Sequence, residues 1–266
     1  MSFAIPFLQI DPVLFSIGPF AVRWYALSYV AGLLFGFQLL RRRAARSRDD
    51  VSVDNIDDFL VWATIGIILG GRLGYVLFYN FQYFLANPLE IFATWRGGMS
   101  FHGGLLGVVI AGLLFCRRHK LSPLILGDML ACSAPIGLFF GRIANFINGE
   151  LYGRVTDAPW GVVFPHAGPE PRHPSQLYEA FLEGLVLFVV LNFMWRSRKI
   201  RANCGVLTGT FIAGYAIARM IVESIWKPDF EKEADLTYGT SLFPSNDSAY
   251  LFLSGKPMNK IGGIYK

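Results

Sequence analysis

Residues 124–147 read "LILGDMLACSAPIGLFFGRIANFI", an apolar run that is long enough to cross a bilayer as one helix. Asp128 interrupts it near the start, and Arg142 and Asn145 interrupt it near the end. Asn148 and Glu150 follow directly, so polar groups gather at one end of the run. Charged groups inside a membrane are costly and usually face a cavity or one another. The stretch therefore predicts a membrane helix with a functional site at one end.

The composition of the whole chain agrees with this reading. Of its 266 residues 53% are hydrophobic and only 16% are charged, whereas soluble domains carry about 25% charged residues. The net charge of +5 is concentrated in a few loops, which suits a lipid bilayer surface and does not favour a nucleic-acid partner. Cys116, Cys132 and Cys204 lack metal-site spacing, so we interpret them as free thiols in packed positions. We expect an integral membrane protein without a metal or another cofactor.

Six segments approach the roughly 20 residues that a membrane helix needs. They are residues 20–40, 59–79, 98–116, 124–147, 177–195 and 205–226. Only helices are expected, because an open strand edge would leave unsatisfied peptide groups in lipid. The predicted fold is an all-α polytopic bundle, with residues 1–226 as the membrane-embedded domain and residues 227–266 as a polar tail.

Three loops are strongly basic and alternate with loops that are not. They begin "RRRAARSR" at residue 41, "RRHK" at residue 117 and "RSRKIR" at residue 196. Loops 80–97 and 148–176 carry only Arg96, Arg154 and Arg172 between them. The positive-inside rule places the basic loops in the cytoplasm. The N-terminus and the two other loops would then face the periplasm of a bacterial cell.

In this orientation every span carries a polar group toward the outer leaflet. The groups are Arg23 and Tyr25, Arg72, His102, Arg142 with Asn145, Glu179 with Glu183, and Arg219 with Glu223. Asp128 is the exception. This convergence predicts a polar chamber that opens to the outer half of the bilayer.

Several of these groups also have a purely structural interpretation. Arg219 and Glu223 are one helical turn apart and could pair only with each other. The N-terminal dipole of a helix could stabilise Glu179 and Glu183. Small residues recur every four positions in three spans and predict close helix packing without implying any chemistry. They are Gly66, Gly70 and Gly74, then Gly103, Gly107 and Ala111, then Gly137 and Gly141.

The segment "GRIANFINGELYG", residues 141–153, matches the signature of the bacterial prolipoprotein diacylglyceryl transferase family. "SFHGGLLG" (100–107), "RHPSQLYE" (172–179) and "VRWYALSY" (22–29) also resemble segments of that family. The resemblance covers roughly residues 10–225 and is carried mainly by the thirteen-residue signature.

The resemblance implies the first step of bacterial lipoprotein maturation. The family transfers the diacylglyceryl group of phosphatidylglycerol to the lipobox cysteine thiol of a prolipoprotein signal peptide. The products are a thioether-linked lipoprotein and glycerol phosphate. The enzymes lie in the inner membrane, act on its periplasmic side and usually have seven spans. Positions that the family treats as functional correspond to Tyr25, His102, Arg142, Asn145, Glu150, Gly153, Arg219 and Glu223.

The chemistry of the reaction suggests a role for most of these residues. Arg142 and Arg219 would clamp the lipid phosphate from two helices and stabilise the charge that develops on the leaving group. A thiol reacts as its thiolate, so a base is needed. His102 is the expected base, with Glu150 and Glu223 as alternatives. Asn145 would orient the headgroup or Arg142, Glu150 would anchor the following loop, and Gly153, Glu223 and Arg72 complete the expected lipid-binding set.

The chain departs from the family pattern after Glu223. Trp226 stands where the family usually has an arginine, and residues 227–266 contain no segment that could form a seventh span. An inactive family member that only binds phospholipid or prolipoprotein is therefore one alternative. A transporter is disfavoured because the polar groups lie toward one leaflet. A phosphatidyl transferase of the CDP-alcohol type would need an aspartate cluster, which the sequence lacks.

Overall fold

The computed structural model describes residues 5–7, 13–17, 20–46, 51–94, 97–165 and 167–226. The predicted polar tail, residues 227–266, lies outside these ranges. The chain divides into two compact units, Met1–Gly66 with Val108–Asp229, and Ile67–Gly107 with Phe230–Lys266. The boundary falls within helices α2 and α4, and each unit is described by itself.

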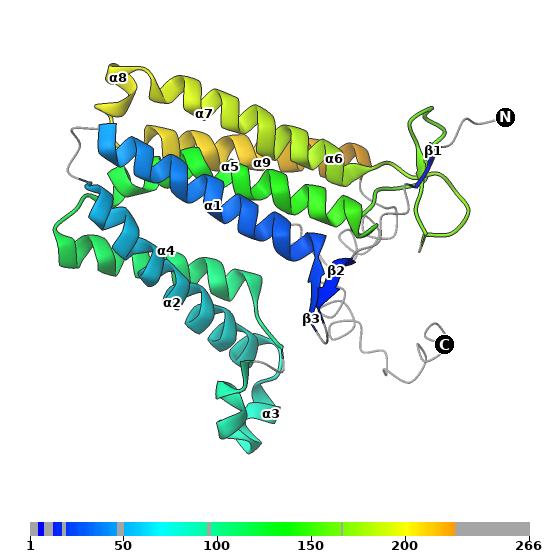
Figure 1. Cartoon of the computed structure of the whole chain (residues 1–266), viewed down its shortest axis with the longest axis horizontal. Coiled ribbons are helices and arrows are strands. Elements are labelled where there is room, and N and C mark those ends of the chain that lie inside the picture. Colours follow the sequence, from blue (N-terminus) through cyan, green and yellow to red (C-terminus); the bar gives the residue numbers. More distant parts are fainter. Residues whose placement is uncertain are drawn as a thin grey trace. The chain divides into compact units, whose positions relative to one another are not determined.

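Helices dominate the described parts of both units (Figure 1). The long ones are α1 (Trp24–Arg46), α2 (Val53–Phe78), α4 (Phe101–His119), α5 (Pro123–Ile147) and α9 (Val206–Trp226). A further long helix consists of α6 (Ser175–Glu179), the π-helical segment η3 (Ala180–Val186) and α7 (Leu187–Trp195). Short helices are α3 (Phe81–Ala86), the 3-10 turn η1 (Pro88–Phe92) and α8 (Arg198–Arg201). The strands are β1 (Ile5–Pro6), β2 (Val13–Ile17), β3 (Phe20–Arg23) and β4 (Val162–Val163).

The helical lengths confirm a polytopic helical membrane protein. Among the described residues, five helices are long and apolar enough to cross a membrane: Val53–Phe78, Phe101–His119, Pro123–Ile147, Ser175–Trp195 and Val206–Ser224. Helix α1 has 23 residues and covers most of the first predicted span, but it is not among these five. The count of six spans therefore stays a prediction.

The start of the first predicted span is wrong. Residues 20–23 form strand β3, which pairs antiparallel with β2 so that Ser16 lies opposite Ala21. The helix begins only at Trp24. Gly18 and Pro19, a dipeptide typical of turns, precede this strand in the sequence and were the signal for a break.

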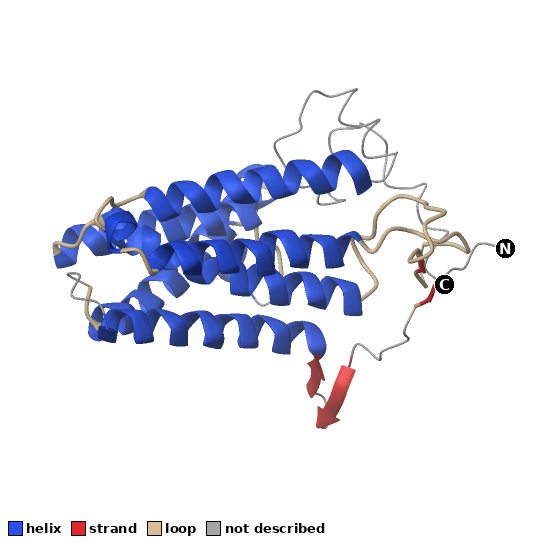
Figure 2. Cartoon of the chain, turned by 90° about the horizontal axis from the view of Figure 1, so that it is seen from above, coloured by secondary structure: helices blue, strands red, loops and turns tan. Residues whose placement is uncertain are grey.

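Helix α5 is the central element of the first unit. It packs against α1, α6, η3, α7 and α9, and these helices run side by side in both overall views (Figures 1 and 2). Glycines allow the close approach: a Cβ on Gly32 of α1 would lie 3.1 Å from the Cα of Gly137. A Cβ on Gly184 of η3 would lie 2.7 Å from the Cβ of Phe139. The backbone of Gly137 is thus closely approached by α1, but a Cβ on Gly137 or on Gly141 would itself have no neighbour within 4 Å.

One end of this bundle is held together by hydrogen bonds to Asp128, which is not among the predicted site residues. Buried Asp128 of α5 accepts hydrogen bonds at the start of α9, from the backbone N–H of Gly205 at 2.8 Å and from both donors of Thr208 at 2.7 Å. A carboxylate at a helix N-terminus is stabilised by the unpaired N–H groups and by the helix dipole. The exceptional position of Asp128 in the sequence is therefore explained by a helix cap.

Basic residues surround the same end. The buried guanidinium of Arg43, in the last turn of α1, donates to the Asn192 side chain and lies 4.4 Å from the ring of Trp195. Cys116 and Cys132 are buried nearby in apolar clusters, as expected. Cys204 is exposed, so the prediction that all three thiols are packed was wrong for this one. It lies in the short connection between α8 and α9.

In the second unit α2 and α4 cross at glycines. A Cβ on Gly103 would collide with the carbonyl oxygen of Gly70 and lie 2.9 Å from the Cα of Gly74. The close packing predicted from these glycines is confirmed. Such contacts replace the hydrophobic driving force that is missing between helices in lipid.

Arg72 of α2 is also engaged inside the second unit. Its buried guanidinium donates to five backbone carbonyls, those of Glu90, Ile91, Ala93, Gly97 and Gly98, at 2.6–3.3 Å. Arg72 therefore holds the segment between η1 and α4. A lipid phosphate would have to replace some of these carbonyls to bind it.

Candidate functional site

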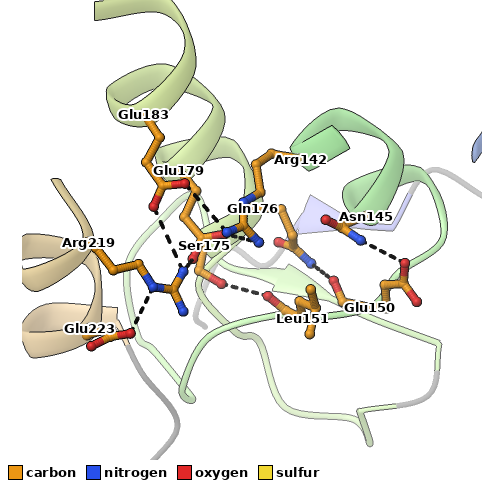
Figure 3. A network of polar contacts seen from close by, with 10 residues as sticks. All are labelled: Arg142, Asn145, Glu150, Leu151, Ser175, Gln176, Glu179, Glu183, Arg219 and Glu223. Carbon is orange, nitrogen blue, oxygen red and sulfur yellow. Dashed lines mark hydrogen bonds and ion pairs between the residues drawn. The ribbon is translucent and has the colours of Figure 1, made fainter. Parts of the chain in front are cut away.

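A network of charged side chains lies where α5 ends, α6 begins and α9 ends (Figure 3). Arg142 comes from the last turns of α5, and Glu179 and Glu183 come from α6 and η3. Arg219 and Glu223 come from the last turns of α9. The polar residues at the end of the predicted span 124–147 thus meet groups from two other helices.

Glu179 joins the two arginines. Its Oε2 lies 3.0 Å from Nη1 of Arg142, and its Oε1 lies 2.5 Å from Nη1 of Arg219. The carboxylate is 8% exposed, so little water screens these pairs. One small anionic group therefore bridges guanidinium groups that are 77 residues apart in the sequence.

Glu183 reaches the same arginines less closely. Its Oε2 lies 3.5 Å from Nη2 of Arg142, and its Oε1 lies 3.9 Å from Nη1 of Arg219. The side chain is fully buried, and its Oε1 has no hydrogen-bond partner among the residues that the structure describes. A buried ionised carboxylate is stable only when it is well paired. Glu183 is therefore the least stabilised carboxylate of the network.

Glu223 completes the network on α9. Its Oε1 accepts a hydrogen bond of 2.8 Å from Nε of Arg219, so these residues do pair along their own helix. Arg219 also reaches Glu179 and Glu183, so the pair is part of a larger cluster. Among the described residues, the two guanidinium groups of Arg142 and Arg219 are thus in contact with three carboxylate groups.

The loop that follows α5 is fixed beside this network. The Asn145 amide donates to Oε1 of Glu150 at 2.8 Å, and the Asn148 amide donates to the same oxygen at 3.3 Å. The sequence predicted that Glu150 anchors this loop, and the observed partners of its carboxylate are these two amides. Asn145 thus orients Glu150. The predicted contact of Asn145 with a lipid headgroup stays a prediction.

The backbone of this loop is pinned by the first residues of α6. The Gln176 amide donates to the Glu150 carbonyl at 2.5 Å, and the Ser175 hydroxyl donates to the Leu151 carbonyl at 2.9 Å. Gly149 and Leu151 both have positive φ angles, 67° and 57°. This conformation is natural for glycine and unfavourable for leucine, so the hydrogen bonds must hold it in place.

Gly153 lies where the loop pairs with the segment before α6. Its backbone N–H donates to the His173 carbonyl at 2.8 Å, and its carbonyl accepts from Arg172 at 3.4 Å. The ring of His173 is 3.2 Å from the Tyr178 hydroxyl, which also accepts from Trp160 at 2.8 Å. Burial, together with nearby Arg154, lowers the pKa of His173 below its ordinary value. Gly153 thus shapes the loop, and its predicted lipid contact stays a prediction.

The structure brings together five of the predicted site residues. Arg142, Asn145, Glu150, Arg219 and Glu223 all lie at this end of the first unit.

Gly153 belongs to the loop after α5. Three other predicted residues are not placed in this network. His102 and Arg72 belong to the second unit, so their part in the same site stays a prediction. The side chain of Tyr25 lies outside what the structure describes. In the described ranges no group of three or more histidine, cysteine, aspartate or glutamate side chains is placed to hold a metal ion.

Three residues of the network were not selected from the sequence. Glu179 and Glu183 were noticed but left open between a structural and a functional role, and Gln176 was quoted only within "RHPSQLYE". The signal for the glutamates was two acidic residues one turn apart in an apolar span. The π-helical geometry that places Glu183 has no comparable sequence signal, although such segments are frequent at functional sites.

Comparison with known proteins gives one family. The family model described as prolipoprotein diacylglyceryl transferase matches residues 12–246. The phosphatidylglycerol–prolipoprotein diacylglyceryl transferase of Rhodospirillum rubrum is 59% identical over 231 residues, which cover 86% of this chain and 84% of that protein. The protein of the same name from Paramagnetospirillum magneticum is 55% identical over 230 residues, with 86% of each chain covered. This chain belongs to the prolipoprotein diacylglyceryl transferase family.

Proposed function

We propose that this protein transfers the diacylglyceryl group of phosphatidylglycerol to the lipobox cysteine thiol of prolipoproteins. The observation that carries the proposal is the bridge between Arg142 and Arg219 by the single carboxylate of Glu179. Two guanidiniums that share one carboxylate are close enough to share one phosphate. The names of the relatives supply the two substrates.

The arginines retain donors for a lipid phosphate. In the described part of the chain Nε of Arg142 and Nη2 of Arg219 take part in no hydrogen bond or ion pair. Their side chains are 18% and 25% exposed, so both can be reached from outside the network. Arginine binds phosphate oxygens in a planar fork, which fixes orientation as well as charge.

The reaction is a displacement at a glyceryl carbon. The sulfur–carbon bond forms while the bond from that carbon to the phosphate oxygen breaks, and the electron pair stays on the phosphate. Arg142 and Arg219 stabilise this growing charge because their positions are fixed before the reaction begins. His102 is the proposed base for the thiol, with Glu150 and Glu223 as alternatives, and Tyr25 and Gly153 remain proposed members of the site.

The proposed location is the bacterial inner membrane with the site toward the periplasm. Within the first unit the basic residues Arg43, Arg198 and Arg201 lie where α1 and α7 end and α9 begins. The Arg142–Arg219 network lies at the opposite ends of α5 and α9. The positive-inside rule therefore favours a cytoplasmic basic end and a periplasmic site.

Reconstitution tests the proposal directly. The full chain is placed in phosphatidylglycerol vesicles with a lipobox peptide, and the peptide mass is followed. The mass of one diacylglyceryl group should be added by the wild type and not by Arg142→Ala. Arg41→Ala is a matched control, because Arg41 pairs with Asp57 at the basic end and is 44% exposed. An unmodified peptide with the inserted wild-type protein, or modification by Arg142→Ala at the wild-type rate, would refute the proposal.

A further inference from the structure

The charges of the network do not balance once a lipid is added. Within the ranges that the structure describes, Glu179, Glu183 and Glu223 lie within ion-pair distance of two guanidiniums, those of Arg142 and Arg219. Ionised throughout, the network carries one excess negative charge before any lipid phosphate binds. The phosphate adds a second one in a site with little water. Like charges in such a site cannot all remain ionised, so one group takes up a proton.

The contacts identify which carboxylate this is. Glu179 has short contacts to both arginines, and Glu223 has one of 2.8 Å and is 29% exposed. Glu183 has only contacts of 3.5 and 3.9 Å and is fully buried. Among the described side chains and backbone groups neither Oε1 of Glu183 nor Oε2 of Glu179 has a hydrogen-bond donor. The Glu179 oxygen still lies 3.0 Å from Nη1 of Arg142, whereas the Glu183 oxygen lies 3.9 Å from Nη1 of Arg219. Any phosphate that draws the guanidiniums away leaves Glu183 with the least compensation.

We propose that Glu183 binds a proton when the lipid phosphate enters and donates it to the leaving phosphate. This inference rests on the proposed function. Glu183 is thereby a further catalytic residue, the general acid of the transfer. The groups that interact with it are Arg142 on α5, Glu179 on α6, and Arg219 and Tyr215 on α9, and Glu223 pairs with Arg219. The two arginines oppose the protonation of Glu183 and the other carboxylates favour it, so phosphate binding, which engages the arginines, shifts the balance.

The proton is conserved through the cycle. Glu183 takes one proton from solvent as the phosphate binds. When the bond between the glyceryl carbon and the phosphate oxygen breaks, the electron pair moves to that oxygen and the Glu183 proton follows. Glycerol phosphate then leaves as a monoanion, and ionised Glu183 returns to Arg142 and Arg219. The thiol proton goes separately to the base and from there to solvent.

Proton uptake on lipid binding is the decisive measurement. The purified full-length enzyme in detergent is titrated with a phosphatidylglycerol analogue in which a methylene group replaces the oxygen between the glyceryl carbon and phosphorus. This analogue keeps its negative charge and cannot react. In weak buffer the wild type should take up close to one proton per lipid bound. At pH values where Glu183 is ionised in the empty enzyme, the Kd should rise about tenfold per pH unit, because uptake of one proton is linked to binding.

Variants separate this role from a structural one. Glu183→Gln should bind the analogue with no proton uptake and with a Kd independent of pH, and its kcat with phosphatidylglycerol should fall roughly 100-fold or more. Glu183→Asp should restore uptake, since it restores an ionisable group. Glu170→Gln is the control: Glu170 is exposed on the loop before α6, and the variant should behave as the wild type.

The outcomes distinguish the two proposals. Thioether formation by the wild type without proton uptake on analogue binding would overturn the role of Glu183 and leave the proposed function intact. Uptake that persists in Glu183→Gln would overturn it as well. Proton-coupled binding without thioether formation would count against the proposed function, and against donation of the proton to a leaving group.

Discussion

The two ends of the helices α5 and α9 each bury a carboxylate, and they treat it in opposite ways. Asp128 accepts three hydrogen bonds of 2.7–2.8 Å from the first residues of α9. Glu183, at the other end, has two long ion-pair contacts and one oxygen without a donor. The first arrangement satisfies the charge permanently. The second leaves it dependent on what else occupies the arginines.

This difference separates a structural charge from a functional one. A carboxylate that is saturated by backbone N–H groups stabilises its helix and has nothing left to offer a substrate. A carboxylate that shares guanidinium groups with its neighbours can release them to a bound anion. Burial of a charged residue in a span therefore does not distinguish the two roles; the identity and geometry of its partners does.

The largest effect on activity is expected at Arg142, which pairs with both Glu179 and Glu183. Arg142→Ala should lower the rate of thioether formation by about 100-fold or more, because a preplaced donor for the leaving group is lost. Arg142→Lys should lose nearly as much, since one ammonium group cannot replace Nη1 toward Glu179 and Nη2 toward Glu183 together. Initial rates measured on the purified variants check this. A lysine variant within a few-fold of the wild type would mean that charge alone is sufficient.

The next effect belongs to the opposite end and should concern stability only. Asp128→Ala removes all three hydrogen bonds at the start of α9 and should lower the free energy of unfolding by about 2–3 kcal/mol. Thr208→Val removes only the hydroxyl donor and should cost about 1 kcal/mol. Thermal unfolding in detergent measures both. The turnover of the molecules that remain folded should not change; if it falls with Asp128→Ala, the two ends are not separate in function.

A smaller effect is expected where α6 holds the loop after α5. Gln176→Met is similar in size and removes the donor to the Glu150 carbonyl, which should cost about 1 kcal/mol. The loop contains Leu151 in an unfavourable conformation, so it should relax and release Glu150 from its place. Faster proteolysis within residues 148–176 and a several-fold lower kcat are the expected readouts. Unchanged proteolysis with a lower kcat would instead assign Gln176 to substrate contact.

The sequence predicted the elements better than it predicted their partners. The span 124–147 is observed as Pro123–Ile147 because a long, predominantly apolar run follows a proline that favours a helix start. The start of the first span failed at residues 20–23, where pairing with β2 outweighs the apolar character of the segment. In the first case the local apolar pattern determines the helix. In the second case pairing with a neighbouring strand overrides that pattern.

Partners across helices are a different matter. Arg142 pairs with Glu179 and Glu183 because α6 and η3 are rotated so that these side chains face α5. The π-helical turn at Ala180–Val186 changes that rotation, and no periodicity in the sequence reports it. The sequence could therefore indicate which end of the bundle carries the chemistry, and only the structure could show that the arginines are already occupied by carboxylates.

The smallest effect is a pH dependence at His173, which lies outside the spans near the network. Burial, and then Arg154, lower the pKa of His173 in the folded protein, so the unfolded chain binds its proton more readily. The contribution of neutral His173 to the free energy of unfolding is therefore fully present above the ordinary histidine pKa of about 6.5. It decreases as the pH falls from there toward the pKa of His173 in the folded protein. His173→Gln should remove this part of the slope between pH 7.5 and 5.5 in thermal unfolding. If the variant keeps the full slope, the acid sensitivity must come from another group, and the Arg142–Arg219 network with its excess of carboxylates is then the place to search.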